Sequence, residues 1–166
     1  QLFSEFSEVN GVEAKTTDPY HREKSIEKFI DEVKAARDDF GIDFIYFTDE
    51  SFLSMTRRRF DAFIEGYREI GLPFFIETRV ETVRSGYAET LEEVGCAGVA
   101  MGVESGSFDL RKTLLSRMTG DNIIIRGFRE FEKTNIRISA NNIIGFPSET
   151  REDIMRTIEI NRSIKP

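Results

Sequence analysis

Helical and strand-like patterns alternate four times along this chain, and this alternation limits the fold more than any other feature. Apolar positions recur at helical spacing over residues 22–40, 60–70 and 82–94, and then in a longer connection over 108–118 and, after a restart at 119–121, up to 134. The β-rich runs cover 42–48, 73–76, 99–103 and 136–144. A closing helix begins at Thr150, with Asp153 placed for a near capping box. The order predicts an α/β fold with a parallel sheet and right-handed crossovers. Four such units make half of a (β/α) barrel or most of an open doubly wound sheet.

Polar side chains follow each strand-like run. Asp49 and Glu50 follow the first run, Glu77 the second and Glu104 the third, while Asn142 interrupts the fourth. Positions 49, 77, 104 and 142 are separated by 28, 27 and 38 residues, which fits βα units with the last one enlarged. Parallel α/β folds place their sites at the carboxyl ends of strands. An acid after a strand can equally cap the next helix, but four such ends in succession favour a site.

The third run has one face without bulky side chains. Residues 99–103 are apolar, and the run ends in Glu104 and Ser105. Because side chains alternate across a strand, Ala100 and Gly102 share a face with Glu104, and the larger apolar residues occupy the other face. This pattern is typical of a strand against which a ligand lies flat.

Composition excludes several classes of function. The chain has 166 residues, a net charge of −7 and one cysteine, Cys96. The negative charge argues against nucleic-acid binding, no apolar run is long enough for a membrane span, and one thiol excludes a disulfide framework. We therefore expect a single domain in a reducing, cytoplasmic compartment. The chain begins at Gln1 and stops after a helical pattern, so we expect a fragment of a longer protein, with residues 1–20 as a loop or linker.

Five ordered segments together resemble the radical S-adenosylmethionine (SAM) enzymes. They are Phe47–Phe52, Glu77–Arg79, Gly102–Ser107, Leu110–Lys112 with Arg117, and Asn142–Thr150. The resemblance runs from about residue 20 to the end, and it is closest to the group that often carries an additional cobalamin-binding domain. It implies strands two to five of a (β/α)₆ barrel with outer helices, so that the whole chain is one partial radical SAM core domain.

The resemblance also implies which residues bind the methionine part of SAM. Asp49 and Glu50 correspond to the strand end near the methionine amino group, and Glu77 is placed for the same moiety. Arg117 matches an arginine that pairs with the SAM carboxylate, a contact that suits the forked guanidinium.

The adenosine part is assigned in the same way. Glu104 and Ser105 correspond to the strand end that meets the ribose. Ile144 and Gly145 correspond to the strand that passes the adenine, and Asn142 at the start of their segment belongs with the cofactor-binding residues.

One departure from the family is large. Radical SAM enzymes hold a [4Fe–4S] cluster with three cysteines spaced CxxxCxxC, because such clusters require thiolates. Cys96 is the sole cysteine, and it lies at the start of its strand, away from the polar ends. We therefore expect that this chain alone neither holds a cluster nor generates a radical, and that any cluster loop or cobalamin domain belongs to the longer protein.

Two other functions remain open from the sequence. Asp49, Glu77 and Glu104 could hold Mg²⁺ in a barrel lyase, although no Lys or His base is evident at another strand end. A non-catalytic binding module is the third interpretation. A four-stranded parallel fragment also leaves two bare sheet edges, which predicts self-association into a homo-oligomer. The substrate is expected to be a small molecule, and the sequence does not identify it.

Overall fold

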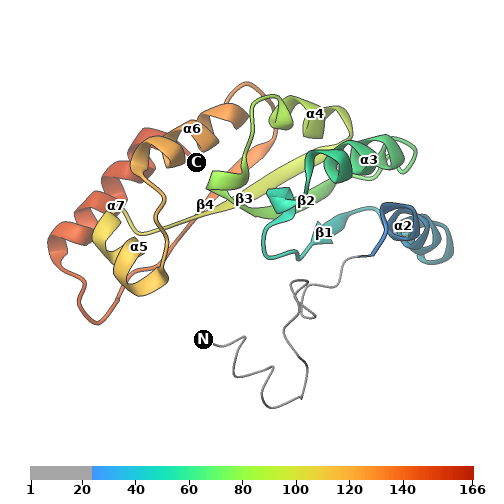
Figure 1. The fold of residues 1–166 in the computed structure, drawn as a ribbon. Coiled ribbons are helices and arrows are strands. Elements are labelled where there is room, and N and C mark those ends of the chain that lie inside the picture. Colours follow the sequence, from blue (N-terminus) through green and yellow to red (C-terminus); the bar gives the residue numbers. More distant parts are fainter. Residues whose placement is uncertain (1–23) are drawn as a thin grey trace, which may run out of the picture.

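The computed structural model describes residues 24–166, so the loop or linker expected at 1–20 lies outside the described part. Its strands are β1 (Ile45–Phe47), β2 (Phe74–Arg79), β3 (Cys96–Glu104) and β4 (Arg137–Asn142). Its helices are α2 (Ile26–Phe40), α3 (Arg57–Tyr67), α4 (Tyr87–Glu93), α5 (Phe108–Leu115), α6 (Asp121–Phe131) and α7 (Arg151–Ile164), with short 3₁₀ turns η1 (Phe52–Ser54) and η2 (Val80–Thr82). All strands are parallel and lie in the order β1-β2-β3-β4 (Figure 1).

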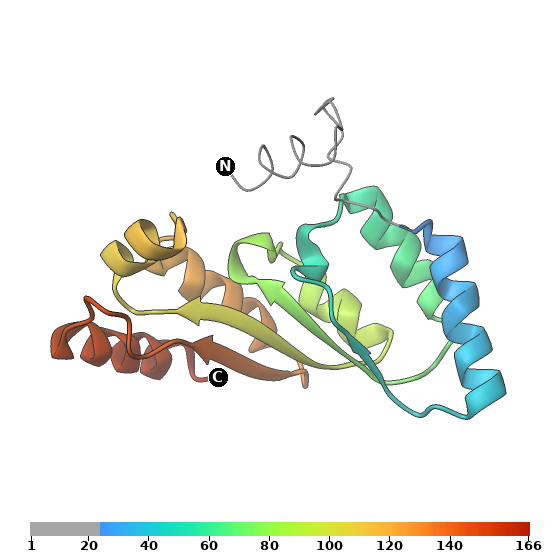
Figure 2. The same ribbon diagram turned by 90° about the horizontal axis from the view of Figure 1, so that it is seen from below.

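The helices cover one face of this sheet (Figures 1 and 2). Alternate strand residues are buried against them, among them Phe47, Ile76, Val99 and Met101. A doubly wound sheet has helices on both faces, and its strand order reverses at a switch point. The sequential order and single helical layer therefore decide for the half barrel, and the predicted partial (β/α) barrel with outer helices is confirmed.

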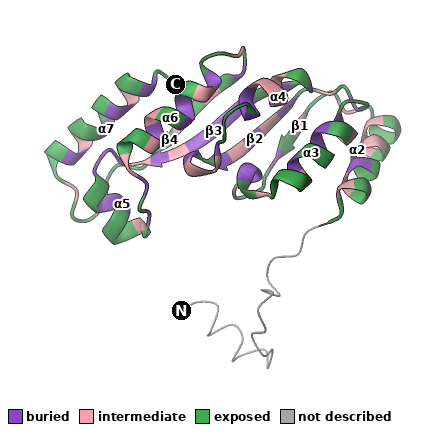
Figure 3. Ribbon diagram, turned by 45° about the horizontal axis from the view of Figure 1, so that its top comes forward, coloured by how far each residue is buried: buried purple, intermediate pink, exposed green. Residues whose placement is uncertain are grey.

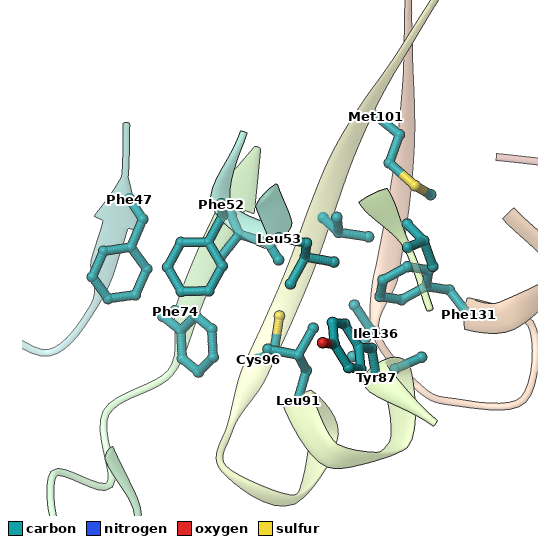
Figure 4. Packing of buried hydrophobic residues seen from close by; sticks show 14 of the residues in the cluster. Phe47, Phe52, Leu53, Phe74, Tyr87, Leu91, Cys96, Met101, Phe131 and Ile136 are labelled. Carbon is teal, nitrogen blue, oxygen red and sulfur yellow. The ribbon is translucent and has the colours of Figure 1, made fainter. Parts of the chain in front are cut away.

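The core lies between the sheet and its helices (Figure 3). Aromatic rings fill its β1–β2 end, where Phe47 packs against Phe52 and Phe74 with ring centroids 5.2 and 5.5 Å apart (Figure 4). Tyr67 meets Phe74 at 4.7 Å, in an edge-on arrangement that aromatic pairs favour. This packing holds β1 in the sheet although the strand is only three residues long.

Several helix ends lie where the sequence predicts them, although α3 (57–67) lies three residues earlier than its predicted range of 60–70. Ser25 caps α2, Gly41 ends it at φ 61°, and Thr150 with Asp153 forms the expected capping box of α7. The predicted helix over 82–94 was wrong at its start: α4 begins at Tyr87, and η2 precedes it.

Two local features explain the late start of α4. The Thr82 hydroxyl donates to the Arg79 carbonyl at 2.6 Å, which ties Thr82 back to the strand end. Gly86 then turns the chain at φ 81° before the helix. Strand β2 also extends to Arg79, past its predicted end at residue 76, so Glu77 lies within the strand.

Gly106 brings the turn after β3 into direct contact with α7. Its amide donates to the Thr157 hydroxyl at 2.8 Å. A Cβ at position 106 would lie 2.2 Å from the Arg156 carbonyl carbon, too close for any side chain. The carboxyl end of β3 is thus fixed to a helix far away in sequence.

No helix within residues 24–166 is long and apolar enough to cross a membrane.

The close contact of Gly106 with α7 predicts that Gly106→Ala lowers the free energy of unfolding by about 3 kcal/mol, because the added methyl group would clash with backbone atoms. Gly71→Ala is the matched control: Gly71 has φ 68° and open space around it, so it should cost only about 1 kcal/mol of backbone strain. Urea unfolding followed by circular dichroism measures both. Equal losses in the two variants would contradict the close contact with α7.

Candidate functional site

The side of the sheet without helices, which we call the open face, carries three rows of residues set by the strand register. The first row is Tyr46, Phe75, Gly98 and Arg137; the second is Glu77, Ala100 and Ser139; the third is Arg79, Gly102 and Asn141. The rows ascend toward the carboxyl ends of the strands, and Glu104 follows at the end of β3. The expected sharing of a face by Ala100, Gly102 and Glu104 fits this register.

An ion-pair network stands at the carboxyl end of β3. Arg117 donates from Nη1 to Glu104 Oε1 and from Nη2 to Glu81 Oε2, both at 2.9 Å. Arg79 pairs with Glu81 at 2.9 Å, so two acids and two arginines alternate. Burial works to raise the pKa of Glu81, but a backbone hydrogen bond and Arg117 outweigh it, and the net pKa is lowered. The network keeps charged groups together at the rim of the open face.

Glu104 adopts an unusual backbone conformation to join this network. Its φ is 66°, in the left-handed region that costs most residues about 1–2 kcal/mol. Gly102 makes room for the pair, because a Cβ there would lie 2.2 Å from Glu104 Oε1 and 3.2 Å from Arg117 Nη1. The absence of a side chain at Gly102 is thus required by the Glu104–Arg117 contact.

Arg111 is a buried residue whose role the sequence did not predict. Its guanidinium donates to the Ser105 carbonyl at 2.5 Å, the Thr119 carbonyl at 3.1 Å and Asp121 Oδ1 at 2.5 Å. These bonds tie the turn after β3 to the segment that carries Arg117. An arginine within a short amphipathic helix, ten residues before an acid, was the signal available in the sequence.

Two of the predicted cofactor-binding residues, Ser105 and Asn142, make side-chain hydrogen bonds within the chain. Ser105 is fully buried, and its hydroxyl accepts from the Ser107 amide at 3.1 Å. Asn142 exchanges amide hydrogen bonds with Asn161 of α7, at 2.9 and 3.2 Å. The asparagine that falls in the open-face rows is its neighbour Asn141, opposite Gly102.

The remaining predicted residues follow the two outer strands, β1 and β4. Asp49 and Glu50 are exposed after β1, and Asp49 lines a 310 Å³ pocket with Phe29, Phe52 and Phe63. Ile144 and Gly145 are exposed after β4. Ile144 lines a groove whose other side is formed by α7 residues, among them Asn161.

Glu77 stands in the middle row with an aromatic partner. Its carboxylate accepts a hydrogen bond from the Tyr46 hydroxyl, which raises the pKa of Tyr46. The tyrosine therefore remains neutral and donates. Glu77, Glu104 and Arg117 are the predicted residues that the structure brings to the open face and its rim.

No metal site is formed by these acids. Within residues 24–166, no three His, Cys, Asp or Glu side chains are grouped to hold a metal ion. Cys96 is free and buried at the start of β3, as its predicted place at the strand entry requires. Burial raises the pKa of its thiol to about 12, so the sulfur is protonated at neutral pH.

Comparison with known proteins points to one family. The family model described as the radical SAM superfamily matches residues 6–160. An uncharacterized methyltransferase of Pyrococcus horikoshii, PH0819, is 28% identical over 144 residues, which cover 86% of this chain and 31% of that protein.

Solved structures share the fold. TsrM from Kitasatospora setae, a radical SAM methyltransferase solved with cobalamin and a [4Fe–4S] cluster, matches with a TM-score of 0.74 and 16% identity over 86% of this chain and 28% of its own. The cobalamin-dependent SAM radical enzyme OxsB matches at 0.64 with 20% identity over 84% and 22%. The chain thus spans less than a third of each of these relatives.

The turn that follows Glu104 is held by Asp153 of α7. Its carboxylate accepts from the Thr150 hydroxyl at 2.7 Å and the Thr150 amide at 3.0 Å. Hydrogen bonds from Thr150 and then Ser107 lower the pKa of Asp153 to about 2.

This lowered pKa predicts an acid-dependent loss of stability. An unfolded Asp has a pKa of about 3.9, so the contribution of Asp153 is complete above about pH 4 and is lost as the pH falls toward 2. The difference in unfolding free energy between wild type and Asp153→Asn should therefore shrink over that window. Chemical unfolding at a series of pH values measures it, with exposed Asp39→Asn as control. A constant difference for Asp153→Asn would contradict the assignment.

Proposed function

Because the chain belongs to the radical SAM superfamily, we propose that its open face is one wall of a SAM site in a larger SAM-dependent enzyme. The observation that carries the proposal is the Glu104–Arg117 pair at the carboxyl end of β3. Below it, β3 contributes only Gly98, Ala100 and Gly102 to the open face, so its largest side chain there is a methyl group. The small residues of β3 add no bulk of their own to this face, and the charged rim offers groups of both signs.

The chemistry of these groups suits SAM. The methionine end of SAM carries an ammonium, a sulfonium and a carboxylate. Glu77 and Glu104 are acceptors for the cationic groups and the ribose hydroxyls, respectively, and Arg117 is a donor for the carboxylate. Arg117 Nε is buried and has no hydrogen-bond partner in the described part of the chain.

The assignments of the other predicted residues stay proposals of unequal support. Asp49 and Glu50 remain candidates for the methionine amino group, and Ile144 and Gly145 for the adenine. Ser105 acts through its place in the turn, since its hydroxyl is buried. We add Asn141, which adjoins Gly102, as the open-face asparagine in place of Asn142.

A [4Fe–4S] cluster does not fit the residues of this chain. Such a cluster needs several thiolates, and Cys96 is the only cysteine, buried and protonated at the opposite end of β3. We therefore propose that the cluster, and cobalamin where the longer protein binds it, are held outside these 166 residues, and that the chain alone is inactive. In the whole enzyme, SAM would supply the reductive-cleavage chemistry for hydrogen abstraction from a substrate.

Isothermal titration of the 166-residue chain with SAM tests the proposal. We expect saturable binding, and we expect Arg117→Gln and Glu104→Gln to weaken it at least about tenfold, or about 1.4 kcal/mol, because each removes a charged contact. Arg68→Gln, which removes an exposed pair with Glu93 on the helical side, should leave the affinity unchanged.

Absence of SAM binding by the folded wild-type chain would overturn the proposal. Equal affinity in wild type and both rim variants would also overturn it, since the Glu104–Arg117 pair would then play no part. Thermal unfolding of each variant confirms that a loss of binding is not a loss of fold.

The bare sheet edges carry a second proposal, self-association. Apolar side chains are exposed near both edges: Phe44 just before β1, and Ile143 and Ile144 after β4. Unpaired strand edges with exposed apolar groups favour pairing with another chain. We expect the 166-residue chain to form a homo-oligomer in multi-angle light scattering, and Ile144→Lys to shift it toward monomer. A wild-type monomer at all concentrations would refute this.

A further inference from the structure

The first row of the open face carries an aromatic platform that the proposed SAM site does not use. The rings of Tyr46 and Phe75 are stacked, with centroids 5.1 Å apart and planes within 8° of parallel. Tyr46 is 51% exposed, although the sheet has a large core on its other face that could bury aromatic rings. Two rings placed face to face on the side without helices call for an explanation other than core packing.

Phe75 is directed toward β3 across a position without a side chain. A Cβ on Gly98 would lie 2.7 Å from Phe75 Cδ2 and 2.8 Å from Cε2, so the ring occupies the space above Gly98. Tyr46, on the strand on the other side, covers one face of the Phe75 ring. The second face is therefore turned toward β3 and β4, where the next residue of the row is Arg137.

Arg137 brings an unpaired positive charge to the same row. It is exposed, and within residues 24–166 its guanidinium has neither an ion pair nor a hydrogen bond. Gly98 lies between Phe75 and Arg137 in this row. The backbones of Phe75 and Arg137 are therefore two strand spacings, about 10 Å, apart. A ring with a short acidic substituent spans that distance.

Ser139 adds a polar group one row above Arg137. Its side chain is exposed on the open face, beside Ala100, and it makes no hydrogen bond in the described part of the chain. A carboxylate held by the Arg137 guanidinium could therefore accept a second hydrogen bond from this hydroxyl. The first and second rows thus provide an aromatic face, a cation and a hydroxyl in neighbouring positions.

We propose that this platform binds a planar aromatic ligand with an anionic substituent: the ring stacks on Phe75, and the anion pairs with Arg137. This inference rests on the proposed function, because it makes that ligand the substrate of the enzyme whose SAM lies at the rim above. Stacking and a guanidinium–carboxylate pair both require the geometry of the first row, and neither draws on Glu104 or Arg117.

Indole-3-acetate is a suitable probe, because the chain contains no tryptophan and indole fluorescence then reports on the ligand alone. We expect its anisotropy to rise on titration with the 166-residue chain. Phe75→Leu should weaken binding about fivefold by removing the stacking face, and Arg137→Gln about tenfold by removing the charge. Tryptamine, which carries a cation, should bind far more weakly in the same assay.

Matched controls separate the platform from general apolar or charge effects. Phe40→Leu removes an exposed ring at the end of α2, and Arg129→Gln removes a cation on α6, both in the helical layer. Neither should change the affinity for indole-3-acetate. Phe75→Leu keeps the side-chain volume nearly constant, so it should fold and should retain the wild-type affinity for SAM.

The outcomes distinguish this inference from the proposed function. A chain that binds SAM but not indole-3-acetate overturns the platform, as does equal probe binding by wild type and Phe75→Leu. If the probe binds with the expected dependence on Phe75 and Arg137 while SAM does not bind, the aromatic–anion site is supported, but the SAM site is rejected, and with it the ligand's role as substrate of a SAM-dependent enzyme.

Discussion

The burial of one side of β3 determines where the functional groups of this chain lie. Val99, Met101 and Val103 are fully buried under the helices, and a strand that buries one set of side chains must present the alternate set on its other face. That alternate set is Gly98, Ala100 and Gly102. A one-residue slip of β3 would exchange the two sets and bring bulky side chains onto the open face. The helical packing is therefore the constraint from which the geometry of the open face follows.

The two glycines of β3 serve different neighbours. Above Gly98 lies the Phe75 ring, and above Gly102 lie the carboxylate of Glu104 and a nitrogen of Arg117. Because neither glycine has a side chain, side chains of other residues lie directly over the backbone of β3. The open face has an aromatic lower part and a charged rim, and each part depends on one of these glycines.

The strained backbone at Glu104 is held from several directions. Arg117 pairs with its carboxylate, Arg111 holds the following carbonyl of Ser105, and Gly106 is seated on α7. A positive φ in a residue other than glycine persists only where the surroundings fix it, and such positions concentrate at functional sites. The contacts come from α5, from the segment after it and from α7, which is far away in sequence, so the rim depends on the packing of that helix against the turn after β3.

The sequence predicted the elements better than the details of the open face. Periodicity was enough for the parallel order and for the two faces of β3, because both follow from local spacing. It did not separate Asn141 from Asn142, since the register between β3 and β4 shifts between Gly102 and Glu104 and the alternation there cannot be read from one strand. The sequence did not predict a role for Tyr46 or Phe75, because only the cross-strand register places them on the open face. Arg111 was missed for a related reason, because its three acceptors lie on a loop and on a second helix.

Charge on the open face differs from charge on the whole chain, and this difference bears on ligand choice. The net charge of −7 would repel an anionic ligand at long range, but at about 0.15 M salt such fields are screened beyond roughly 8 Å. At short range the local charges decide. Arg137 of the first row has no ion pair in the described part of the chain, whereas Glu81 and Glu104 at the rim are paired with Arg117. An anion that reaches the platform therefore meets a cation that has no ion-pair partner in the described part of the chain. Glu77 lies nearest, and its carboxylate is engaged by the Tyr46 hydroxyl. The same hydrogen bond orients Tyr46 against Phe75, so the acid of the middle row supports the aromatic stack below it.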